Sequence, residues 1–400
     1  MSFPVVECLR IYPVAGVSRP LFSGNLADLW RPSAAIVSAE LRGGIVGYGE
    51  AIVFPELTGE TRDSILANLG GDSPDGSELL SAVDSFHPDS FPSALESIEA
   101  LPRHADDGSL MCGARCSVEL ALLDATMRFF DRGMDEVVTW MGLPGFGKPG
   151  CVRNIRYSGV VAAGGVDASM WQLRRLRRRG VRGFKLRIAG AEAGESLASV
   201  TDHLRRLLAK GKVALRVDAG GMLTGTEVVE RLGELADVPF GAIEQPVKRG
   251  DIAGLRLVRE RFDAPLIADE SIVTIEDARE EIEHGGWDGV SVKIGKCGGL
   301  LPALRIAALI RRSGLRVQLG CALGETSILA AAGVRFLEAC PGVSWAEGCL
   351  GWLREDVVTR PVRFRFGGKT PRLGGPGLGV EVDEASLERI CKDPPIELRF

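Results

Sequence analysis

The 400-residue sequence predicts an α/β protein with a (β/α)₈-type barrel and a smaller α+β region. From about residue 150, eight short β-rich runs recur roughly every 28 residues, separated by polar stretches with the pattern of helices. Before that point, and again near the C-terminus, apolar and polar residues alternate as they do in antiparallel strands. A chain of this length is long enough for one large barrel and a second, smaller domain.

The first part of the chain combines predicted strands with predicted helices. Residues 4–12 and 34–52 alternate in hydrophobicity and contain turn glycines such as Gly43, which predicts antiparallel strands. The segment 72–110 is rich in Ser, Pro, Asp and Gly and predicts loops and short helices. Residues 113–132 carry apolar side chains at helical spacing and end next to a glycine, so one long helix is expected there.

The second part of the chain has the alternation expected of a parallel barrel, in which each strand is followed by a helix. The basic run Arg174–Arg179 lies at helical spacing before a strand, so a solvated outer helix face is preferred to a nucleic-acid patch. The tail, 360–400, returns to alternating strands and is expected to pack back on the first region. The eight predicted strands are 152–161, 183–188, 213–219, 241–246, 264–270, 288–295, 315–321 and a weaker one at 344–348.

Composition argues against several classes of partner. The chain has 45% hydrophobic and 25% charged residues and a net charge of −5, with no long basic block, which argues against nucleic acid. No apolar stretch reaches the ~20 residues that span a bilayer, and the N-terminus lacks a signal-peptide pattern, so we expect a cytoplasmic protein without membrane association. Its nine cysteines are irregularly spaced without a Cys-x-x-Cys pair, which predicts free thiols rather than disulfides.

Three acidic residues mark the ends of three successive predicted strands. Asp218 ends LRVD, Glu244 lies in AIEQP and Asp269 lies in LIADES, at intervals of 26 and 25 residues. Parallel strands of one sheet end on the same side, so these carboxylates are expected to converge there. Each aspartate taken alone is better explained by helix capping or a turn than by metal binding, but glutamate is a poor N-cap, and the series favours a hard divalent cation.

Further charged residues lie at other strand ends of the same barrel. Lys185 and Arg187 are two residues apart on one strand, so both side chains are expected on its inward face. Lys293 ends an apolar run, Glu270 follows the third acid directly, and Glu325 follows the seventh strand. A lone lysine on a strand is often a surface residue, but an inward charge needs a partner or a place at the barrel mouth.

Such a site suits the removal of a proton next to a carboxylate. A divalent metal held by three carboxylates leaves coordination positions that a substrate carboxylate fills. Metal charge and nearby cations stabilise the enolate dianion as it forms. A lysine then serves as the base, provided that neighbouring cations and desolvation lower its pKa. A barrel aldolase with a Schiff base at Lys293 or Lys185 is the alternative without a metal, and three converging carboxylates argue against it.

The ordered motifs resemble the enolase superfamily and, within it, the muconate-lactonizing enzyme/mandelate racemase family. The similarity covers almost the whole chain and includes GYGEA (47–51), TGET (58–61), the LGET segment and the terminal GPGLGV. The K-x-(K), D, E-Q-P, A-D-E-S and K-I-x-K-x-G-G motifs follow in the family's order. None of the four histidines lies on the seventh strand, where the mandelate racemase branch has one, so the chain is most similar to the lysine-type, muconate-lactonizing branch.

The resemblance implies a modified TIM barrel, (β/α)₇β, under an α+β capping domain. The capping domain would comprise residues 1–135, completed by 366–400, and the barrel residues 136–365. The resemblance also implies a lyase or isomerase that acts on a small carboxylate and uses Mg²⁺, with Mn²⁺ as the other candidate metal. A homo-oligomer is expected, because members of the family commonly assemble.

Residue by residue, the resemblance assigns roles to the site. Asp218, Glu244 and Asp269 match the metal ligands, which agrees with the spacing argument. Lys293 matches the catalytic lysine after the sixth strand. The residues that match supporting positions around the metal and the substrate carboxylate are Lys185, Glu270 and Glu325.

Two positions depart from the family pattern. Arg187 stands where the second lysine of the K-x-K motif is usual, and a guanidinium is a poor base because it stays protonated in proteins. Gly220 stands where asparagine is frequent, which removes a hydrogen bond near the metal site. The change at 187 favours one-base chemistry through Lys293, such as dehydration or cycloisomerisation. Racemisation or epimerisation of amino-acid derivatives or dipeptides stays open, as does a degenerate member that only binds a metal or ligand.

Substrate specificity is expected from loops of the capping domain. These loops span about 15–26 and 54–61. Arg19 is a candidate for binding a second anionic group of the substrate, although a solvated loop residue is the better explanation of it.

Overall fold

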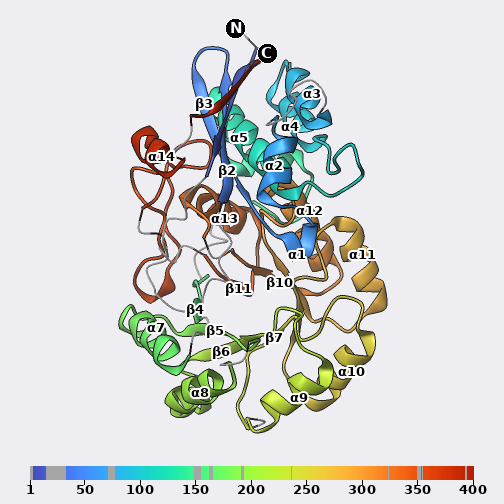
Figure 1. Ribbon diagram of the computed structural model, residues 1–400, viewed down its shortest axis with the longest axis vertical. Helices are drawn as coiled ribbons and strands as arrows, with labels where there is room; N and C mark the ends of the chain where they lie inside the picture. The colour runs from blue at the N-terminus through green and yellow to red at the C-terminus, as the bar shows by residue number, and fades with distance from the viewer. Residues whose placement is uncertain are drawn as a thin grey trace.

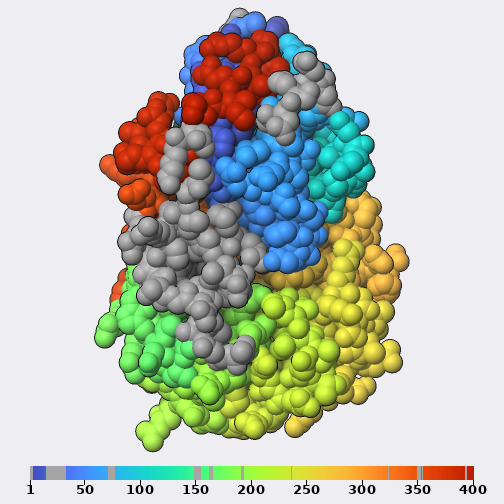
Figure 2. Space-filling model, viewed as in Figure 1, coloured from blue at the N-terminus to red at the C-terminus, as the bar shows by residue number. Residues whose placement is uncertain are grey.

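The structure of the protein is a computed structural model. Figure 1 shows an antiparallel sheet with helices at one end, which carries both chain termini, and a barrel at the other end. In Figure 2 the N-terminal segments and the last residues of the chain lie together above the barrel. The described residues are 3–14, 33–70, 77–147, 155–161, 165–190, 193–235, 237–322, 324–348, 353, 355–391 and 394–400.

Four antiparallel strands form the sheet of the first region: β1 (Val6–Pro13), β2 (Ser33–Leu41), β3 (Ile45–Ile52) and β12 (Ile396–Arg399). Their order across the sheet is β12–β1–β2–β3. The strands predicted for 4–12 and 34–52 are therefore confirmed. Because β12 pairs with β1, the tail of the chain lies beside its start, as expected (Figure 1).

One long helix, α5 (Cys112–Phe130), packs across this sheet and is buried along most of its length. Two glycines of β3 allow the close approach. A Cβ on Gly47 would lie 2.3 Å from the Ala121 carbonyl oxygen, and one on Gly49 would lie 1.9 Å from that of Ser117. The predicted long helix and the predicted short helices before it are confirmed. The predicted segment 72–110 contains α3 (Glu78–Asp84) and α4 (Phe91–Glu99), and the other short helices of this region are α1 (Pro55–Thr58), α2 (Arg62–Asn68) and α6 (Met134–Trp140).

Eight parallel strands form the second region: β4 (Gly159–Val161), β5 (Gly183–Arg187), β6 (Ala214–Asp218), β7 (Ile243–Glu244), β8 (Leu266–Ala268), β9 (Gly289–Val292), β10 (Arg316–Leu319) and β11 (Trp345–Ala346). They lie side by side in chain order. A parallel bridge between Tyr157 and Ala346 joins the last strand to the first, and the Ser158 N–H donates to the Ala346 carbonyl oxygen at 2.8 Å. All eight predicted strands are confirmed, each shorter than the run that predicted it.

Helices between the strands cover the outside of the barrel (Figure 1). In the first of them, Arg174, Arg177 and Arg178 are exposed, so the basic run is a solvated helix face, as predicted. The helices are α7 (Val166–Arg178), α8 (Ala193–Ala209), α9 (Gly225–Gly233), α10 (Ile252–Arg261), α11 (Ile275–His284), α12 (Leu300–Arg312), α13 (Ser327–Ala339) and, in the tail, α14 (Glu384–Cys391).

Two buried carboxylates connect the first region to the barrel. Glu50, in β3, accepts hydrogen bonds from the backbone N–H groups of Thr326 at 2.8 Å and Leu329 at 3.1 Å, at the start of α13. Glu119, in α5, accepts one from the N–H of Leu300 at 3.1 Å, at the start of α12. The first N–H groups of a helix have no partner within it, so these carboxylates satisfy donors that would otherwise be buried alone. The sheet is thereby fixed over two neighbouring barrel helices.

No helix within the described residues is both long and apolar enough to cross a membrane. The seven cysteines that the described part of the chain contains are thiols outside disulfides, as predicted. Six of them are buried, where a thiol packs as a small hydrophobic group.

Candidate active site

The three residues predicted to bind a metal lie at the carboxyl ends of three neighbouring strands. Asp218 ends β6, Glu244 ends β7 and Asp269 follows β8 directly. All three side chains are buried, and Glu244 and Asp269 are each only 1% exposed. Because the strands are parallel neighbours, these carboxylates lie at one mouth of the barrel.

Lys185, in β5, reaches three carboxylates of this mouth. Its Nζ lies 2.7 Å from Glu347 Oε2, 2.9 Å from Glu244 Oε1 and 3.3 Å from Asp218 Oδ2. Burial by itself lowers the pKa of Lys185, but the three carboxylates outweigh burial and hold the pKa well above its usual value. Lys185 is therefore a fixed cation at the centre of an acidic cluster.

A second buried cation, which the sequence analysis did not single out, neutralises the same cluster. Arg216, in β6, donates a hydrogen bond to Glu347 Oε1 at 2.7 Å. It also donates to Gln318, whose amide donates in turn to Glu244 Oε2 at 2.8 Å. The signal for Arg216 was its place two residues before Asp218, which puts both side chains on the inward face of one strand. Glu347 had no comparable signal, because the last strand is the weakest of the eight.

Two lysines share the third acid of the site. The Nζ of Lys293, which follows β9, contacts Asp269 Oδ2 at 2.5 Å, and that of Lys296 contacts Asp269 Oδ1 at 2.8 Å. Lys296 is wholly buried and also donates to the carbonyl oxygen of Ser291 at 3.0 Å. Burial by itself raises the pKa of Asp269, but the two lysines outweigh it and hold the pKa below its usual range. The sequence signal for Lys296 was its place in the KIGK motif, three residues after Lys293.

The carboxylates around Lys293 oppose one condition that the sequence analysis set for a lysine base. That condition was a pKa lowered by desolvation and by nearby cations. Burial does lower the pKa of Lys293, but the carboxylates of Asp269 and Glu270 outweigh it and raise the pKa above its usual value. The physical reason is the direct contact with Asp269, which favours the charged form of the lysine.

Arg187 lies at the edge of the acidic cluster. It pairs in register with Asp218 on the neighbouring strand, and its Nη1 lies 3.9 Å from Asp218 Oδ2. Its Nη2 contacts Met222 Sδ at 3.3 Å. Because Lys185 also approaches Asp218, the structure agrees with the expectation that both basic side chains leave β5 on the same face.

Burial raises the pKa of both predicted supporting acids. Burial and the neighbouring Asp269 raise the pKa of Glu270 to about 7, and its buried Oε2 has no hydrogen-bond partner among the described residues. Burial raises the pKa of Glu325 well above its usual range, and its carboxylate accepts a hydrogen bond from the Ala322 N–H at 3.3 Å. Arg19, together with the predicted loop at 15–26, lies outside the described residues.

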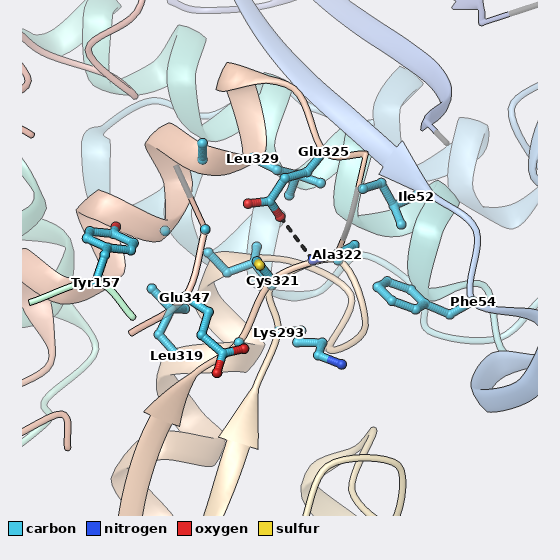
Figure 3. Close-up of a pocket in the computed structure, with 16 residues that line it drawn as sticks. Ile52, Phe54, Tyr157, Lys293, Leu319, Cys321, Ala322, Glu325, Leu329 and Glu347 are labelled. Carbon is cyan, nitrogen blue, oxygen red and sulfur yellow. Dashed lines mark hydrogen bonds between the residues drawn. The ribbon is translucent and has the colours of Figure 1, made fainter. Parts of the chain in front are cut away.

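A pocket of about 370 Å³, part of it open to solvent, adjoins the acidic cluster. Figure 3 shows Phe54 and Tyr157 at opposite sides of this pocket, with Glu325, Glu347 and Lys293 between them. Phe54 comes from the loop predicted to set specificity. Two of these residues, Lys293 and Glu347, connect the pocket to the cluster through their ion pairs. The apolar part of the wall consists of Ile52, Ile294, Leu319, Ala322, Leu329 and Ala330.

The carboxylate oxygens of the cluster are the kind of ligand that a hard divalent cation prefers, and in this structure lysine ammonium groups pair with them. Within the described residues, no group of three or more His, Cys, Asp or Glu side chains is arranged as a metal site. Lysine ammonium groups contact all three predicted ligands, and Lys185 alone contacts two of them. The buried Glu270 Oε2, beside Asp269, has no hydrogen-bond partner within the described residues. Carboxylate oxygens on neighbouring strand ends, with an unsatisfied acceptor beside them, suit Mg²⁺ or Mn²⁺.

Carboxylates, lysines and a pocket at the strand ends of a barrel are the arrangement on which TIM-barrel enzymes build their active sites. Residues 169–386, more than half of the chain, match the family described as enolase C-terminal domain-like. The chain belongs to this family and is an enzyme of the enolase superfamily, as the motifs implied.

Similar proteins of known activity include both cycloisomerases and epimerases. A chloromuconate cycloisomerase of Cupriavidus pinatubonensis is 25% identical over 367 residues, which cover 90% of this chain and 91% of the relative. A hydrophobic dipeptide epimerase of Enterococcus faecalis is 26% identical over 335 residues, which cover 82% and 85%. The crystal structure of N-succinyl Arg/Lys racemase from Bacillus cereus has a TM-score of 0.78 at 20% identity and covers 99% of this chain and 100% of that chain, so the fold is shared.

Proposed function

We propose that the protein is a Mg²⁺-dependent lyase or isomerase that removes the proton α to the carboxylate of a small substrate. The reaction is one-base chemistry through Lys293, of the dehydratase or cycloisomerase type. The observation that carries the proposal is a contrast between two basic residues. Lys293 lines the pocket, whereas Arg187, at the other position where an acid/base lysine is usual, directs its guanidinium to Asp218 and Met222.

The other lysines near the cluster are less suited to proton transfer. Among the described residues that line the pocket, Lys293 is the only lysine. Lys185 is bound by three carboxylates, and Lys296 is wholly buried with carbonyl and carboxylate partners. An amine held in this way has no free path to a substrate proton, so the base is Lys293.

Asp218, Glu244 and Asp269 would hold the metal, because they are the buried oxygen donors at neighbouring strand ends. When bound, a divalent cation supplies positive charge that stabilises an enolate formed from the substrate carboxylate. Asp269 belongs both to this ligand set and to the ion pair with Lys293. The carboxylate that raises the pKa of Lys293 is thus one whose charge a bound cation would neutralise. In its neutral form Lys293 accepts the α-proton at Nζ. Reversal of this transfer returns a proton to the α-carbon, and in a dehydration the Nζ ammonium gives a proton to the departing hydroxide.

The remaining charged residues bind and orient the substrate. Lys185 and Arg187 supply fixed positive charge beside Asp218. Burial favours the protonated form of Glu325, which then donates a hydrogen bond into the pocket. The apolar wall around Phe54 suits a substrate with a hydrocarbon portion. Assembly into a homo-oligomer and a cytoplasmic location stay predictions.

A second candidate is racemisation or epimerisation of amino-acid derivatives or dipeptides. The similarity to a dipeptide epimerase and to the fold of an N-succinyl Arg/Lys racemase favours it. Inversion at the α-carbon needs proton transfer on both faces of the enolate. Arg187 offers a cation rather than a titratable amine for the second transfer, which is why one-base chemistry ranks first.

The test measures exchange of the Cα proton with D₂O in the presence of Mg²⁺, across a library of acid sugars, dipeptides and cycloisomerase substrates. We expect Lys293→Ala to lower the exchange rate by about 10³-fold, the typical contribution of a general base, with Mg²⁺ binding in calorimetry unchanged. Lys212→Ala, at an exposed lysine, is the matched control and should retain the wild-type rate. Full exchange by Lys293→Ala would exclude this lysine as the base. No exchange of any compound by the wild type would favour a degenerate, ligand-binding member.

A further inference from the structure

A tight turn follows the first acid of the cluster and holds it. The Met222 N–H donates to the Ala219 carbonyl oxygen at 3.2 Å, and both residues between them, Gly220 and Gly221, have left-handed backbones with φ of +58° and +65°. Positive φ at both central positions is typical of a type I′ turn. The Gly220 N–H donates to Asp218 Oδ1 at 2.9 Å, so the turn also orients this carboxylate.

The guanidinium of Arg187 lies directly over this turn. A Cβ built on Gly220 would lie 2.5 Å from Arg187 Nη2, 2.8 Å from Cζ and 2.9 Å from Nη1, which is closer than real Cβ atoms approach. The same guanidinium contacts Met222 Sδ at 3.3 Å and lies 3.9 Å from Asp218. Because the colliding atoms are the end of a flexible side chain, a side chain at 220 would displace the guanidinium rather than the backbone.

We propose that Gly220 is a positioning residue, whose missing side chain seats the Arg187 guanidinium beside Asp218 and outside the pocket. The two departures at positions 187 and 220 then form one structural unit instead of two independent changes. The inference rests on the proposed function and explains one part of it. A guanidinium fixed beside Asp218 and over the turn supplies a permanent positive charge on the β5–β6 side of the site. Proton transfer is then left to Lys293.

Backbone conformation alone does not require glycine at this position. Asparagine and aspartate also adopt left-handed conformations in turns, and the hydrogen bond to Asp218 uses a backbone N–H that every residue except proline has. Gly221 has nearly the same φ, but its Cβ would meet no atom closer than 3.4 Å, an ordinary contact distance. The collision with Arg187 is therefore what distinguishes Gly220 from its neighbour.

The test is a double-mutant cycle that combines Gly220→Asn with Arg187→Ala, with Gly221→Asn as the matched control in both backgrounds. One readout is the urea midpoint of the metal-free protein, and the other is the rate of Cα-proton exchange with Mg²⁺. We expect Gly220→Asn to slow exchange at least roughly fivefold when Arg187 is present and less than about twofold in the Arg187→Ala protein, as for residues in contact. The urea midpoint should fall in the first background only. Gly221→Asn should have the same small effect in both.

Equal effects of Gly220→Asn on the urea midpoint in the two backgrounds would overturn the proposal, whatever the exchange rates show. If the asparagine variant fails to fold, Gly220→Ala repeats the cycle, and Gly221→Ala controls for the strain of a left-handed alanine. Failure of this inference and failure of the proposed function give different results. If the two substitutions change the urea midpoint additively, Gly220 does not position Arg187. If Lys293→Ala retains full exchange, Lys293 is not the base, and the urea midpoints can still show coupling between Gly220 and Arg187.

Discussion

Lysines on two sides of the barrel mouth differ in how their charge is used. On the β5–β6 side, Lys185 contacts three carboxylates and its side chain is 6% exposed. On the β8–β9 side, Lys293 is paired with Asp269, its side chain is 13% exposed, and it lines the pocket. Lys185 lies within β5 and Lys293 directly follows β9 of the same barrel, and both reach carboxylates at its mouth, so strand position alone does not separate their roles. The number of carboxylate partners and access to the pocket separate a structural cation from a base.

The β8–β9 side contains the same contrast at shorter range. Lys296 and Lys293 bind the two oxygens of one carboxylate, that of Asp269, but Lys296 is wholly buried. One lysine therefore fixes the acid from inside the barrel, and the other approaches it from the pocket. This division predicts that stability and activity depend on different members of the pair.

The largest expected effect on stability comes from removing the cation with three partners. Lys185→Met should lower the free energy of unfolding at neutral pH by about 3–5 kcal/mol, because it leaves buried carboxylates without their cation. Urea unfolding followed by circular dichroism measures the change. Arg205→Met, which breaks exposed pairs with Asp202 and Asp237, is the control and should cost under about 1 kcal/mol. Equal losses in the two variants would remove the distinction drawn here for Lys185.

A smaller effect should separate the two lysines that share Asp269. Lys296→Met should lower the free energy of unfolding by about 3 kcal/mol, since it removes a buried charge partner. Lys293→Met should cost only about 1 kcal/mol, because its side chain is partly open and the acid keeps its inner partner. Cα-proton exchange should be lost in Lys293→Met. If Lys293→Met is the less stable variant, the assignment of the inner lysine as the structural one is wrong.

The smallest effect concerns the pH dependence of stability at Glu270. Burial and Asp269 raise the pKa of Glu270 from 4.5 to about 7, so folding favours its protonated form. Its contribution to stability is complete below the unfolded pKa and is lost as the pH rises from about 4.5 through about 7. Glu270→Gln should remove up to about 3 kcal/mol of this decline. Urea titrations across this pH range measure the free energy of unfolding, and Glu283→Gln, at an exposed glutamate, is the control. If the free energy falls with pH equally in Glu270→Gln and the wild type, Glu270 is not the source of the decline.

Most of the fold follows from local patterns in the sequence. The eight strands were predictable because each is a short buried run between amphipathic helices, and parallel strands place their ends at one mouth. The positions of Asp218, Glu244 and Asp269 followed from the same regularity. The ends of the strands were less predictable, since β7 and β11 keep only two residues each in the ladder.

The partners of the charged residues were not predictable, because they depend on how the barrel closes. Lys185 meets Glu347 only because β11 returns to the first strands of the ring. The direction of the pKa shift of Lys293 depends on its distance to Asp269, which no spacing in the sequence encodes.

Gly220 is a further example of what the sequence left unresolved. The sequence predicted the loss of a side-chain hydrogen bond at this position. The structure shows that the backbone N–H of Gly220 still binds Asp218, and that the space left by the missing side chain is filled by Arg187. A contact between residues on two strand ends becomes visible only when both strands are placed.

The stereochemistry of exchange in D₂O tests one-base chemistry most directly. A substrate from the library is incubated with the wild-type enzyme and Mg²⁺, recovered before completion, and analysed for deuterium at the α-carbon and for configuration there. With Lys293 as the sole base, recovered substrate carries deuterium with its configuration retained, and Lys293→Ala gives no deuterium. Deuterium together with inverted configuration would contradict the account, since a second group would then transfer protons on the other face.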